Sequence, residues 1–387
     1  MIRNKLLIDV SVIARIDAGT GIQRAVRELS QQLIQNPPSG YDVKLVRASR
    51  VLGYRYVVHS PRTNTYSNPI FGAAVRIAVG DVFLGLDFSA HILPRHHRQL
   101  DRWNKAGAKL FFVVYDLLPA QCPEWFTKKG AAAHSRWLFT IITHATGLIC
   151  ISRAVANDLT EWLSMHDDGV NRKLNISWFH LGSDVATSVP RQGKLLDLDN
   201  ILKRLRQRST VIMVGTIEPR KGYTQALSAF EILWQEEKQV NLVIVGKAAW
   251  GVETLTKRLT EHPERGNHLF WFESASDEVL CSLYQASSGL LMASEGEGFG
   301  LPLVEAAHYG KPILARDLPV FQEIAGEHAT YFSGNTPHEM SSALNNWIKS
   351  IANGSVIKSI GIECISWEKS ASMLFERIRH QLEKTSS

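Results

Sequence analysis

The regular alternation of short apolar runs with amphipathic stretches between residues 211 and 324 constrains the fold more than any other feature. Each run has the length of a buried strand, and the stretch that follows has the apolar period of a helix. Strands that alternate with helices form a parallel sheet covered by helices on both faces. The pattern predicts strands at 211–214, 242–245, 269–272, 290–292 and 312–315, and helices at 223–234, 252–260, 277–285, 303–309 and 320–324.

A similar alternation occupies the first 180 residues, interrupted by an irregular stretch at 50–70. At 387 residues the chain is too long for one ordinary core and suits two. We therefore predict an α/β protein with two Rossmann-like domains that face each other across a cleft. The expected parts are a domain at 1–190, a linker at 191–208, a second domain at 209–366, and a helix at 367–387 that returns to the first domain.

The composition is that of a soluble globular protein, with 45% hydrophobic and 21% charged residues. No apolar run reaches the roughly 18 to 20 residues that span a bilayer, and the N-terminus leads directly into a strand pattern without a cleavable signal. The four cysteines are far apart, which argues against a zinc site or a disulfide framework. We expect a cytoplasmic protein.

Basic residues are in excess only in the first part of the chain. Residues 1–100 hold 13 of the 43 Lys and Arg residues but only 6 of the 37 Asp and Glu residues. A basic N-terminal face can meet the anionic inner membrane at its cytoplasmic side or a phosphate-bearing acceptor, or it can be an ordinary solvated surface. We expect no nucleic-acid partner.

A glycine-rich turn, Ser294-Glu-Gly-Glu-Gly-Phe-Gly-Leu-Pro-Leu-Val-Glu305, follows the predicted strand at 290–292. Such a turn, with a proline in the first turn of the next helix, points backbone N–H groups outward at the strand's carboxyl edge, where they can hold an anion. Glu297 and Glu305 flank the turn, so one carboxylate can face each end of a long polar ligand. Glycines that only permit packing are the alternative. The residues expected to line the ligand are Gly298, Phe299, Gly300 and Leu301.

A second phosphate-binding stretch, Val214-Gly-Thr-Ile-Glu-Pro-Arg-Lys-Gly222, opens the second domain. Arg220 and Lys221 are predicted at a helix N-terminus, where cations and free N–H groups together favour a diphosphate. Gly215 and Thr216, at the end of the preceding strand, belong to the same predicted site. For either cation alone, the alternative interpretation is a solvated basic residue beside a turn.

The first domain contributes two candidate positions. Gly19 and Gly21 form a turn between a strand and a helix, but Arg24 stands where a dinucleotide-binding fingerprint needs its third glycine, which argues against a nicotinamide cofactor. Tyr115 and Asp116 end a buried strand, at the edge where open α/β sheets bind ligands.

These motifs resemble a known family. Glu297 to Glu305 closely resembles the E-x7-E signature of retaining glycosyltransferases of the GT-B fold, family 4, and the stretch from Gly215 to Lys221 resembles that family's G-T-x-E-P-R-K. The chain looks most like bacterial mannosyltransferases that build O-polysaccharides from GDP-mannose. In that family a histidine commonly precedes Asp116, and here Tyr115 takes its place.

The resemblance implies the roles of the site residues. Arg220 and Lys221 would stabilise the leaving diphosphate, Glu297 would contact the sugar, and Glu305 would bind the ribose, while Asp116 and Gly21 would act from the first domain. It also implies a nucleotide-sugar donor, a saccharide or polyprenyl-diphosphate-linked saccharide acceptor, and no cofactor or obligatory metal. The alternatives are another GDP- or UDP-sugar as donor, a nucleotide-sugar epimerase, and a non-catalytic carbohydrate-binding protein.

Overall fold

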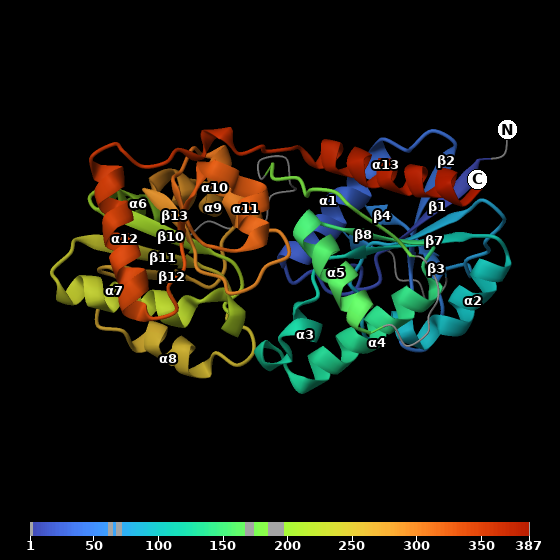
Figure 1. Ribbon diagram of the computed structural model, residues 1–387, viewed down its shortest axis with the longest axis horizontal. Helices are drawn as coiled ribbons and strands as arrows, with labels where there is room; N and C mark the ends of the chain where they lie inside the picture. The colour runs from blue at the N-terminus through green and yellow to red at the C-terminus, as the bar shows by residue number, and fades with distance from the viewer. Residues whose placement is uncertain (1–2, 61–64, 67–71, 167–173, 185–196, 387) are drawn as a thin grey trace. The chain divides into compact units, whose positions relative to one another are not determined.

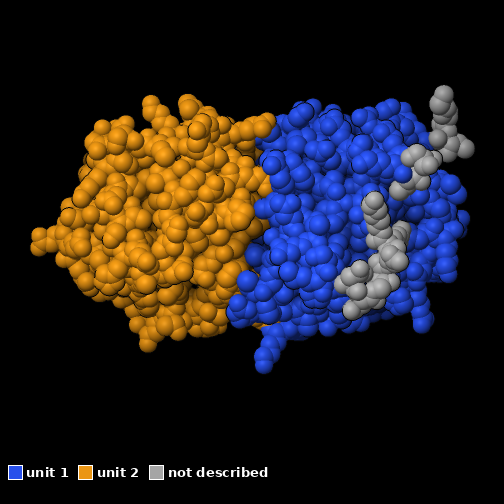
Figure 2. All heavy atoms as spheres, in the orientation of Figure 1, with its two compact units in different colours: residues 1–124, 128–182, 365–387 blue, residues 125–127, 183–364 orange. Residues whose placement is uncertain are grey.

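The computed structural model describes residues 3–60, 65–66, 72–166, 174–184 and 197–386. The chain divides into two compact units (Figures 1 and 2). Unit 1 comprises residues 1–124, 128–182 and 365–387, and unit 2 comprises residues 125–127 and 183–364. Among the described residues, no helix combines the length and the apolar character needed to cross a membrane.

Unit 1 is built on a seven-stranded sheet in the order β3-β2-β1-β6-β7-β8-β9, in which only β3 runs antiparallel to its neighbour. Its central strands are continuous apolar runs because helices cover both faces. The strands are β1 (Asn4–Asp9), β2 (Tyr41–Arg47), β3 (Arg55–Val57), β6 (Val82–Gly85), β7 (Lys109–Val114), β8 (Gly147–Cys150) and β9 (Asn175–Trp178), with a separate hairpin of β4 (His59–Ser60) and β5 (Thr65–Tyr66).

The helices of unit 1 follow the strands in the order of an open α/β fold. Thr20 caps the first of them, since its hydroxyl accepts from the N–H of Gln23 at 3.4 Å and the Gln23 side chain accepts from the N–H of Thr20 at 3.3 Å. The helices are α1 (Gly21–Gln35), η2 (Leu93–His96), α2 (His97–Lys105), α3 (Leu118–Gln121), η3 (Pro123–Trp125, which ends in unit 2), α4 (Lys128–His144), α5 (Arg153–Met165) and α13 (Trp367–Ser386).

The C-terminal helix α13 packs against α1, β8 and β9 of unit 1 (Figure 1). The Ser370 hydroxyl donates to the carbonyl of His180 at 2.7 Å, and Arg377 Nε donates to the carbonyl of Trp178 at 2.9 Å. Leu374 in the same helix is fully buried. The last helix of the chain therefore completes the core of its first unit.

Unit 2 contains a six-stranded, wholly parallel sheet in the order β12-β11-β10-β13-β14-β15. Its strands are β10 (Ser209–Val214), β11 (Val240–Val245), β12 (Leu269–Phe272), β13 (Gly289–Met292), β14 (Ile313–Arg316) and β15 (Thr330–Phe332). Its helices are α6 (Leu198–Arg206), η4 (Pro219–Lys221), α7 (Tyr223–Gln235), α8 (Glu253–Glu261), α9 (Asp277–Ala286), α10 (Leu301–His308), α11 (Pro319–Ala325), η5 (Gly326–His328), α12 (Pro337–Ala352) and η6 (Ser359–Gly361).

The boundaries of the parts differ from the sequence prediction. Most of the described part of the expected linker at 191–208 is helix α6, whose Leu202 and Leu205 are buried. Residues 191–196 of that linker lie outside the described residues. Strand β15 and helix α12, for which the sequence analysis makes no prediction, extend the second unit.

Candidate active site

The turn after β10 carries the two predicted cations into a fixed position. Gly222 ends η4 with φ +69°, and a Cβ at this residue would lie 2.3 Å from the carbonyl oxygen of Ala293, which follows β13. Only glycine tolerates both this backbone conformation and this approach. The Tyr223 hydroxyl donates to the carbonyl of Gly215 at 2.8 Å, so the two ends of the turn are held together. The predicted residue Thr216 is half-buried in the same turn.

Arg220 and Lys221 meet Glu297 across the two glycine-containing turns. The Lys221 ammonium is hydrogen-bonded to Glu297 Oε1, and Arg220 Nη1 lies 3.4 Å from Glu297 Oε2. The Ser294 hydroxyl donates to Glu297 Oε1 at 2.9 Å. Arg220 Nη1 also donates to the carbonyl of Gly296 at 2.7 Å. Three of the predicted catalytic residues are thus brought together within unit 2.

The electrostatics of this cluster favour an ionised Glu297. Burial acts to raise the pKa of its carboxyl group, but the charges of Lys221 and Arg220 and the hydrogen bonds from Lys221 and Ser294 outweigh burial and hold the pKa below its usual value. The side chain of Glu297 is only 8% exposed. A buried carboxylate beside two cations is stable because the cations replace the water that it has lost.

A further acid, which the sequence analysis did not single out, completes the cluster. Glu218 lies directly before Pro219, and its Oε1 is 2.8 Å from Arg220 Nη2. The residue is 6% exposed. The cluster of Glu218, Arg220, Lys221 and Glu297 therefore balances two cations with two carboxylates. The sequence signal that could have identified Glu218 is its place as a charged residue immediately before the Pro-Arg-Lys turn.

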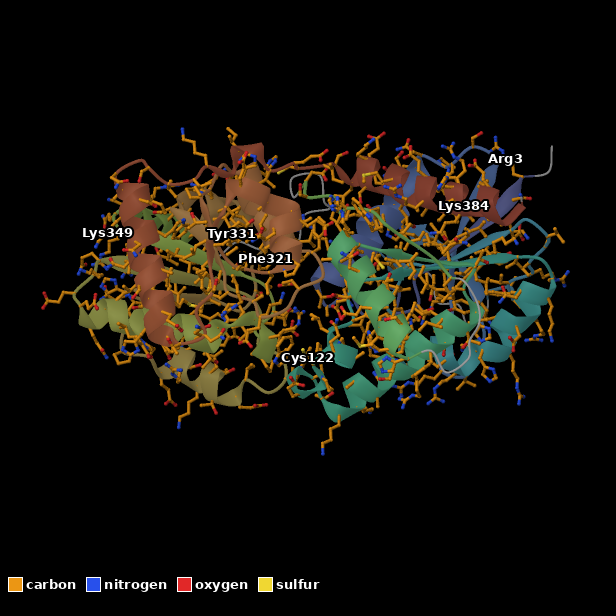
Figure 3. The ribbon with its side chains drawn as sticks, in the orientation of Figure 1. Arg3, Cys122, Phe321, Tyr331, Lys349 and Lys384 are labelled. Atoms are coloured by element: carbon orange, nitrogen blue, oxygen red, sulfur yellow. The ribbon has the colours of Figure 1, made fainter. Side chains whose placement is uncertain are left out.

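The glycine-rich turn leads into α10. Gly298 and Phe299 are buried, Leu301 is half-buried, and Gly300 caps the helix with φ +95°. A Cβ at Gly300 would lie 2.8 Å from a ring carbon of Phe321, so the turn packs directly on α11. Phe321 and Tyr331 are labelled in Figure 3. The hydroxyl of Tyr331 fixes α11 in turn, because it donates to the carbonyl of Phe321 at 3.2 Å.

Glu305 lies in the second turn of α10 and is almost fully buried. Its Oε2 accepts a hydrogen bond from the Tyr284 hydroxyl at 2.9 Å. One donor to its carboxylate is therefore the neutral hydroxyl of Tyr284 on α9.

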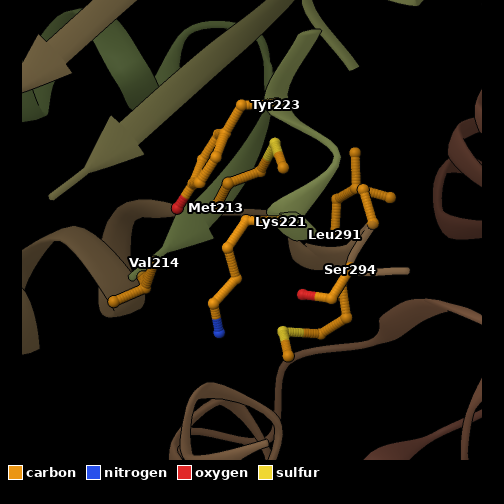
Figure 4. Close-up of a pocket in the computed structure, with 8 residues that line it drawn as sticks. Met213, Val214, Lys221, Tyr223, Leu291 and Ser294 are labelled. Atoms are coloured by element: carbon orange, nitrogen blue, oxygen red, sulfur yellow. The ribbon is translucent and has the colours of Figure 1, made fainter. Parts of the chain in front are cut away.

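A small pocket opens beside Lys221 (Figure 4). It lies at the carboxyl ends of β10 and β13, the two neighbouring strands at the centre of the sheet in unit 2. Ligands of open α/β sheets bind at this edge. The residues that line it are Met213, Val214, Lys221, Tyr223, Leu291, Met292, Ala293 and Ser294.

The remaining predicted residues belong to unit 1. Asp116 follows β7, and its Oδ1 accepts from the N–H of Leu118, two residues on, at 3.2 Å. Tyr115 is buried, and its hydroxyl donates to the carbonyl of Leu86 at 2.9 Å. Gly21 is exposed at the first position of α1. Asp116 and Gly21 thus lie at strand-to-helix turns, whereas the Tyr115 side chain packs in the core.

Unit 1 also holds two buried acids that the sequence analysis missed. Asp9 ends β1, and its Oδ2 accepts from the hydroxyls of Tyr54 at 3.0 Å and Ser89 at 3.1 Å. Asp87 follows β6, and its Oδ2 accepts from the N–H groups of Val12 at 2.6 Å and Ile13 at 2.8 Å. The sequence signal that could have identified them is a single aspartate at the end of each of two apolar strands.

Burial raises the pKa of both acids. The pKa of Asp9 rises to about 6 because burial outweighs its hydrogen bonds. The pKa of Asp87 rises to about 7 because of burial and the nearby charge of Asp9. Within the residues that the structure describes, no group of three or more His, Cys, Asp or Glu side chains is arranged to hold a metal ion.

Comparison with known proteins shows which proteins this chain is similar to. Residues 198–353 match the family "Glycosyl transferases group 1". The serotype-specific mannosyltransferase WbdA of Escherichia coli is 40% identical over 376 residues, which are 97% of this chain and 46% of that protein. The chain thus spans about half the length of this relative.

Solved structures share the whole fold. Sucrose-phosphate synthase of Thermosynechococcus elongatus superposes with a TM-score of 0.66 at 17% identity, covering 99% of this chain and 100% of that chain. The HepE protein of Anabaena, in complex with UDP-glucose, has a TM-score of 0.62 at 16% identity, with 99% of each chain covered. The chain therefore has the GT-B fold of these solved structures, and its residues 198–353 are similar to a glycosyl transferases group 1 domain.

Proposed function

We propose that the protein is a retaining hexosyltransferase that transfers mannose from GDP-mannose to a saccharide acceptor during synthesis of a cell-surface O-polysaccharide. The observation that carries the proposal is the 40% identity with the mannosyltransferase WbdA across 97% of this chain. The cluster of Arg220, Lys221 and Glu297 supports it, because a nucleotide-sugar donor presents a diphosphate beside a sugar.

In the proposed reaction the bond between the sugar's anomeric carbon and the diphosphate oxygen breaks. The acceptor hydroxyl forms a new bond to that carbon on the same face, and its proton passes to the departing diphosphate. Negative charge grows on the diphosphate as the bond breaks, so cations beside it bind the transition state more tightly than the ground state. Lys221 and Arg220 take this role.

The other predicted residues bind the two substrates. Glu297 contacts a sugar hydroxyl, Glu305 accepts hydrogen bonds from the ribose, and N–H groups of the turn at 298–301 hold sugar and phosphate oxygens. Asp116 and Gly21 serve the reaction from unit 1. We expect the acceptor to be a saccharide, either free or linked to polyprenyl diphosphate, and the enzyme to work in the cytoplasm at the inner membrane.

No divalent metal or other cofactor takes part in this proposal. Positive charge comes instead from Lys221, Arg220 and the N-terminus of α10. In other enzymes that act on phosphate groups, Mg²⁺ provides such charge. Transfer in excess EDTA should therefore proceed at the untreated rate. Loss of transfer in EDTA with recovery in Mg²⁺ or Mn²⁺ would contradict a metal-free reaction.

The direct test incubates the purified chain with a mannosylated acceptor and a panel of GDP- and UDP-sugars. We expect a product one hexose heavier with GDP-mannose, and NMR should show the donor's α configuration retained at the new linkage. The Lys221→Ala variant is the matched negative control. An inverted linkage, or transfer from no sugar of the panel, would refute the proposal.

The same assay separates the alternatives. Preferential transfer from another donor would assign a different sugar or base, and a free sugar released without acceptor would indicate an epimerase. Binding of a nucleotide sugar without turnover under any condition would indicate a carbohydrate-binding protein.

A further inference from the structure

The cluster formed by Glu218, Arg220, Lys221 and Glu297 carries no net charge while its two acids are ionised. A diphosphate brings at least two negative charges to it. Because like charges repel strongly where water is excluded, a diphosphate that binds both cations requires one carboxylate to give up its place. The two acids are not equally able to do so.

Glu218 is the acid whose backbone is fixed on both sides. The N–H of Ile217 donates to the carbonyl of Lys247 at 2.8 Å, and the N–H of Ala249 returns a bond to the carbonyl of Ile217 at 2.9 Å. The carbonyl of Glu218 accepts from the N–H of Lys221 at 3.1 Å. Glu297 also lies outside any helix or strand, but it is the acid paired with both Lys221 and Arg220. A diphosphate that takes up both cations therefore competes with Glu297 directly.

Arg220 keeps two partners when Glu297 moves. Its Nη2 is paired with Glu218 at 2.8 Å, and its Nη1 donates to the carbonyl of Gly296 at 2.7 Å. Its own carbonyl accepts from the N–H of Glu295 at 2.7 Å, which joins η4 to the glycine-rich turn. A guanidinium group is planar, so bonds to both Nη atoms fix its orientation.

We propose that Glu218 is a positioning residue for the diphosphate site: it anchors Arg220 permanently, while Glu297 acts as an exchangeable counter-ion that the diphosphate displaces. The proposal rests on the proposed function and adds to it a residue to which no role was assigned. It divides two chemically equal acids into a fixed partner and a movable one.

The test compares nucleoside diphosphates with monophosphates by isothermal titration. GDP and GMP form one pair and UDP and UMP a second, so the ratio of the two Kd values in a pair reports the contribution of the terminal phosphate. The variant is Glu218→Gln, which keeps the shape and removes the charge. Its matched control is Glu231→Gln, since Glu231 pairs with Arg258 at the same 2.8 Å on α7 and α8.

Two effects of Glu218→Gln have opposite signs. Loss of a negative charge by itself strengthens the binding of a diphosphate. Loss of the anchor weakens it, because a neutral hydrogen bond is about half as strong as a charge-assisted one. We expect the anchor to dominate, so that the preference for the diphosphate falls about fivefold, and Glu231→Gln to leave it unchanged.

The double variant with Arg220→Ala shows whether Glu218 acts through Arg220. In that background Glu218→Gln should cause no further fall in the preference, because the two substitutions remove one interaction. A stronger preference in Glu218→Gln, an unchanged one, or an equal fall with and without Arg220 would overturn the positioning role. Binding of neither diphosphate to the unaltered chain would instead overturn the proposed function, and the role of Glu218 with it.

Discussion

The burial of Asp9 and Asp87 predicts that the free energy of unfolding changes with pH, whatever reaction the protein catalyses. Both have a pKa above the ordinary 3.8, at about 6 for Asp9 and about 7 for Asp87. At a pH between the ordinary and the raised pKa values, the folded state therefore holds protons on these two carboxyl groups that the unfolded state has lost. The stability that this difference contributes is fully present below pH 4 and disappears as the pH rises through 6 and 7.

The magnitude follows from the two pKa values. One pKa unit corresponds to about 1.4 kcal/mol. At pH 5, which lies roughly one unit below the pKa of folded Asp9 and two units below that of folded Asp87, each acid still stabilises the folded state by that number of units. The pair thus contributes about 4 kcal/mol at pH 5 and almost nothing at pH 8. Asp87 accounts for about 3 kcal/mol of this change.

The variant Asp87→Asn isolates the larger part of this pH dependence. An amide oxygen can still accept from the N–H groups of Val12 and Ile13, and the side chain stays neutral at every pH. Urea unfolding followed by tryptophan fluorescence at pH 5, 6, 7 and 8 gives the free energy of unfolding of both proteins. Relative to the unaltered chain, the variant should gain about 3 kcal/mol between pH 5 and pH 8.

The control is Asp42→Asn, which removes a half-exposed carboxylate of β2 that pairs with Lys44 at 3.0 Å. It makes the same chemical change in the same unit at the surface, where an ion pair contributes at most about 1 kcal/mol. A difference between Asp87→Asn and the unaltered chain that does not change with pH, or that changes with the opposite sign, would refute the assignment of raised pKa values.

Three further predictions concern unit 2. Lys221→Ala should reduce the transfer rate by roughly 100- to 1000-fold because it removes a preorganised cation, whereas Arg258→Ala on the surface of α8 should leave the rate unchanged in the same mannosyl-transfer assay. Glu305→Gln should weaken the binding of GDP and of guanosine by the same factor, since its predicted partner is the ribose, and a loss confined to GDP in calorimetry would contradict that contact. Gly222→Ala should destabilise the fold by more than Gly310→Ala in thermal unfolding. Both glycines have positive φ, which costs of order 1–3 kcal/mol for other residues, but only a Cβ at Gly222 meets a backbone oxygen.

The sequence predicts the layered architecture well because local patterns specify it. The apolar runs at 211–214 and 290–292 became β10 and β13, and the glycine-rich stretches after them became the turns of the site. The linker prediction is weaker because residues 198–206 are polar overall. Their buried members Leu202 and Leu205 lie three residues apart on one face, which suffices for α6 once unit 2 is present to bury them.

Contacts between distant segments set the limit of sequence reasoning. Asp9 and Asp87 are 78 positions apart, and only the pairing of β1 with β6 brings their burial and charge together. Glu218 lies inside a recognised motif, yet its partner could not be identified before the turn's backbone was known. Sequence spacing specifies which residues share an element, whereas the partner of a buried charge is decided by packing.

Tyr115 illustrates the same limit inside a motif. The end of a central strand predicted a site residue, and Asp116 does lie at the turn, but the phenol ring of Tyr115 is buried and its hydroxyl is bonded to the carbonyl of Leu86. Burial raises its pKa well above the ordinary value, with a further contribution from the charge of Asp87, so the hydroxyl stays protonated at neutral pH. It therefore supplies a hydrogen-bond donor to the core. A residue that ends a strand can face either side of the sheet, and here only the neighbouring Asp116 lies at the turn, where its carboxylate accepts from the N–H of Leu118.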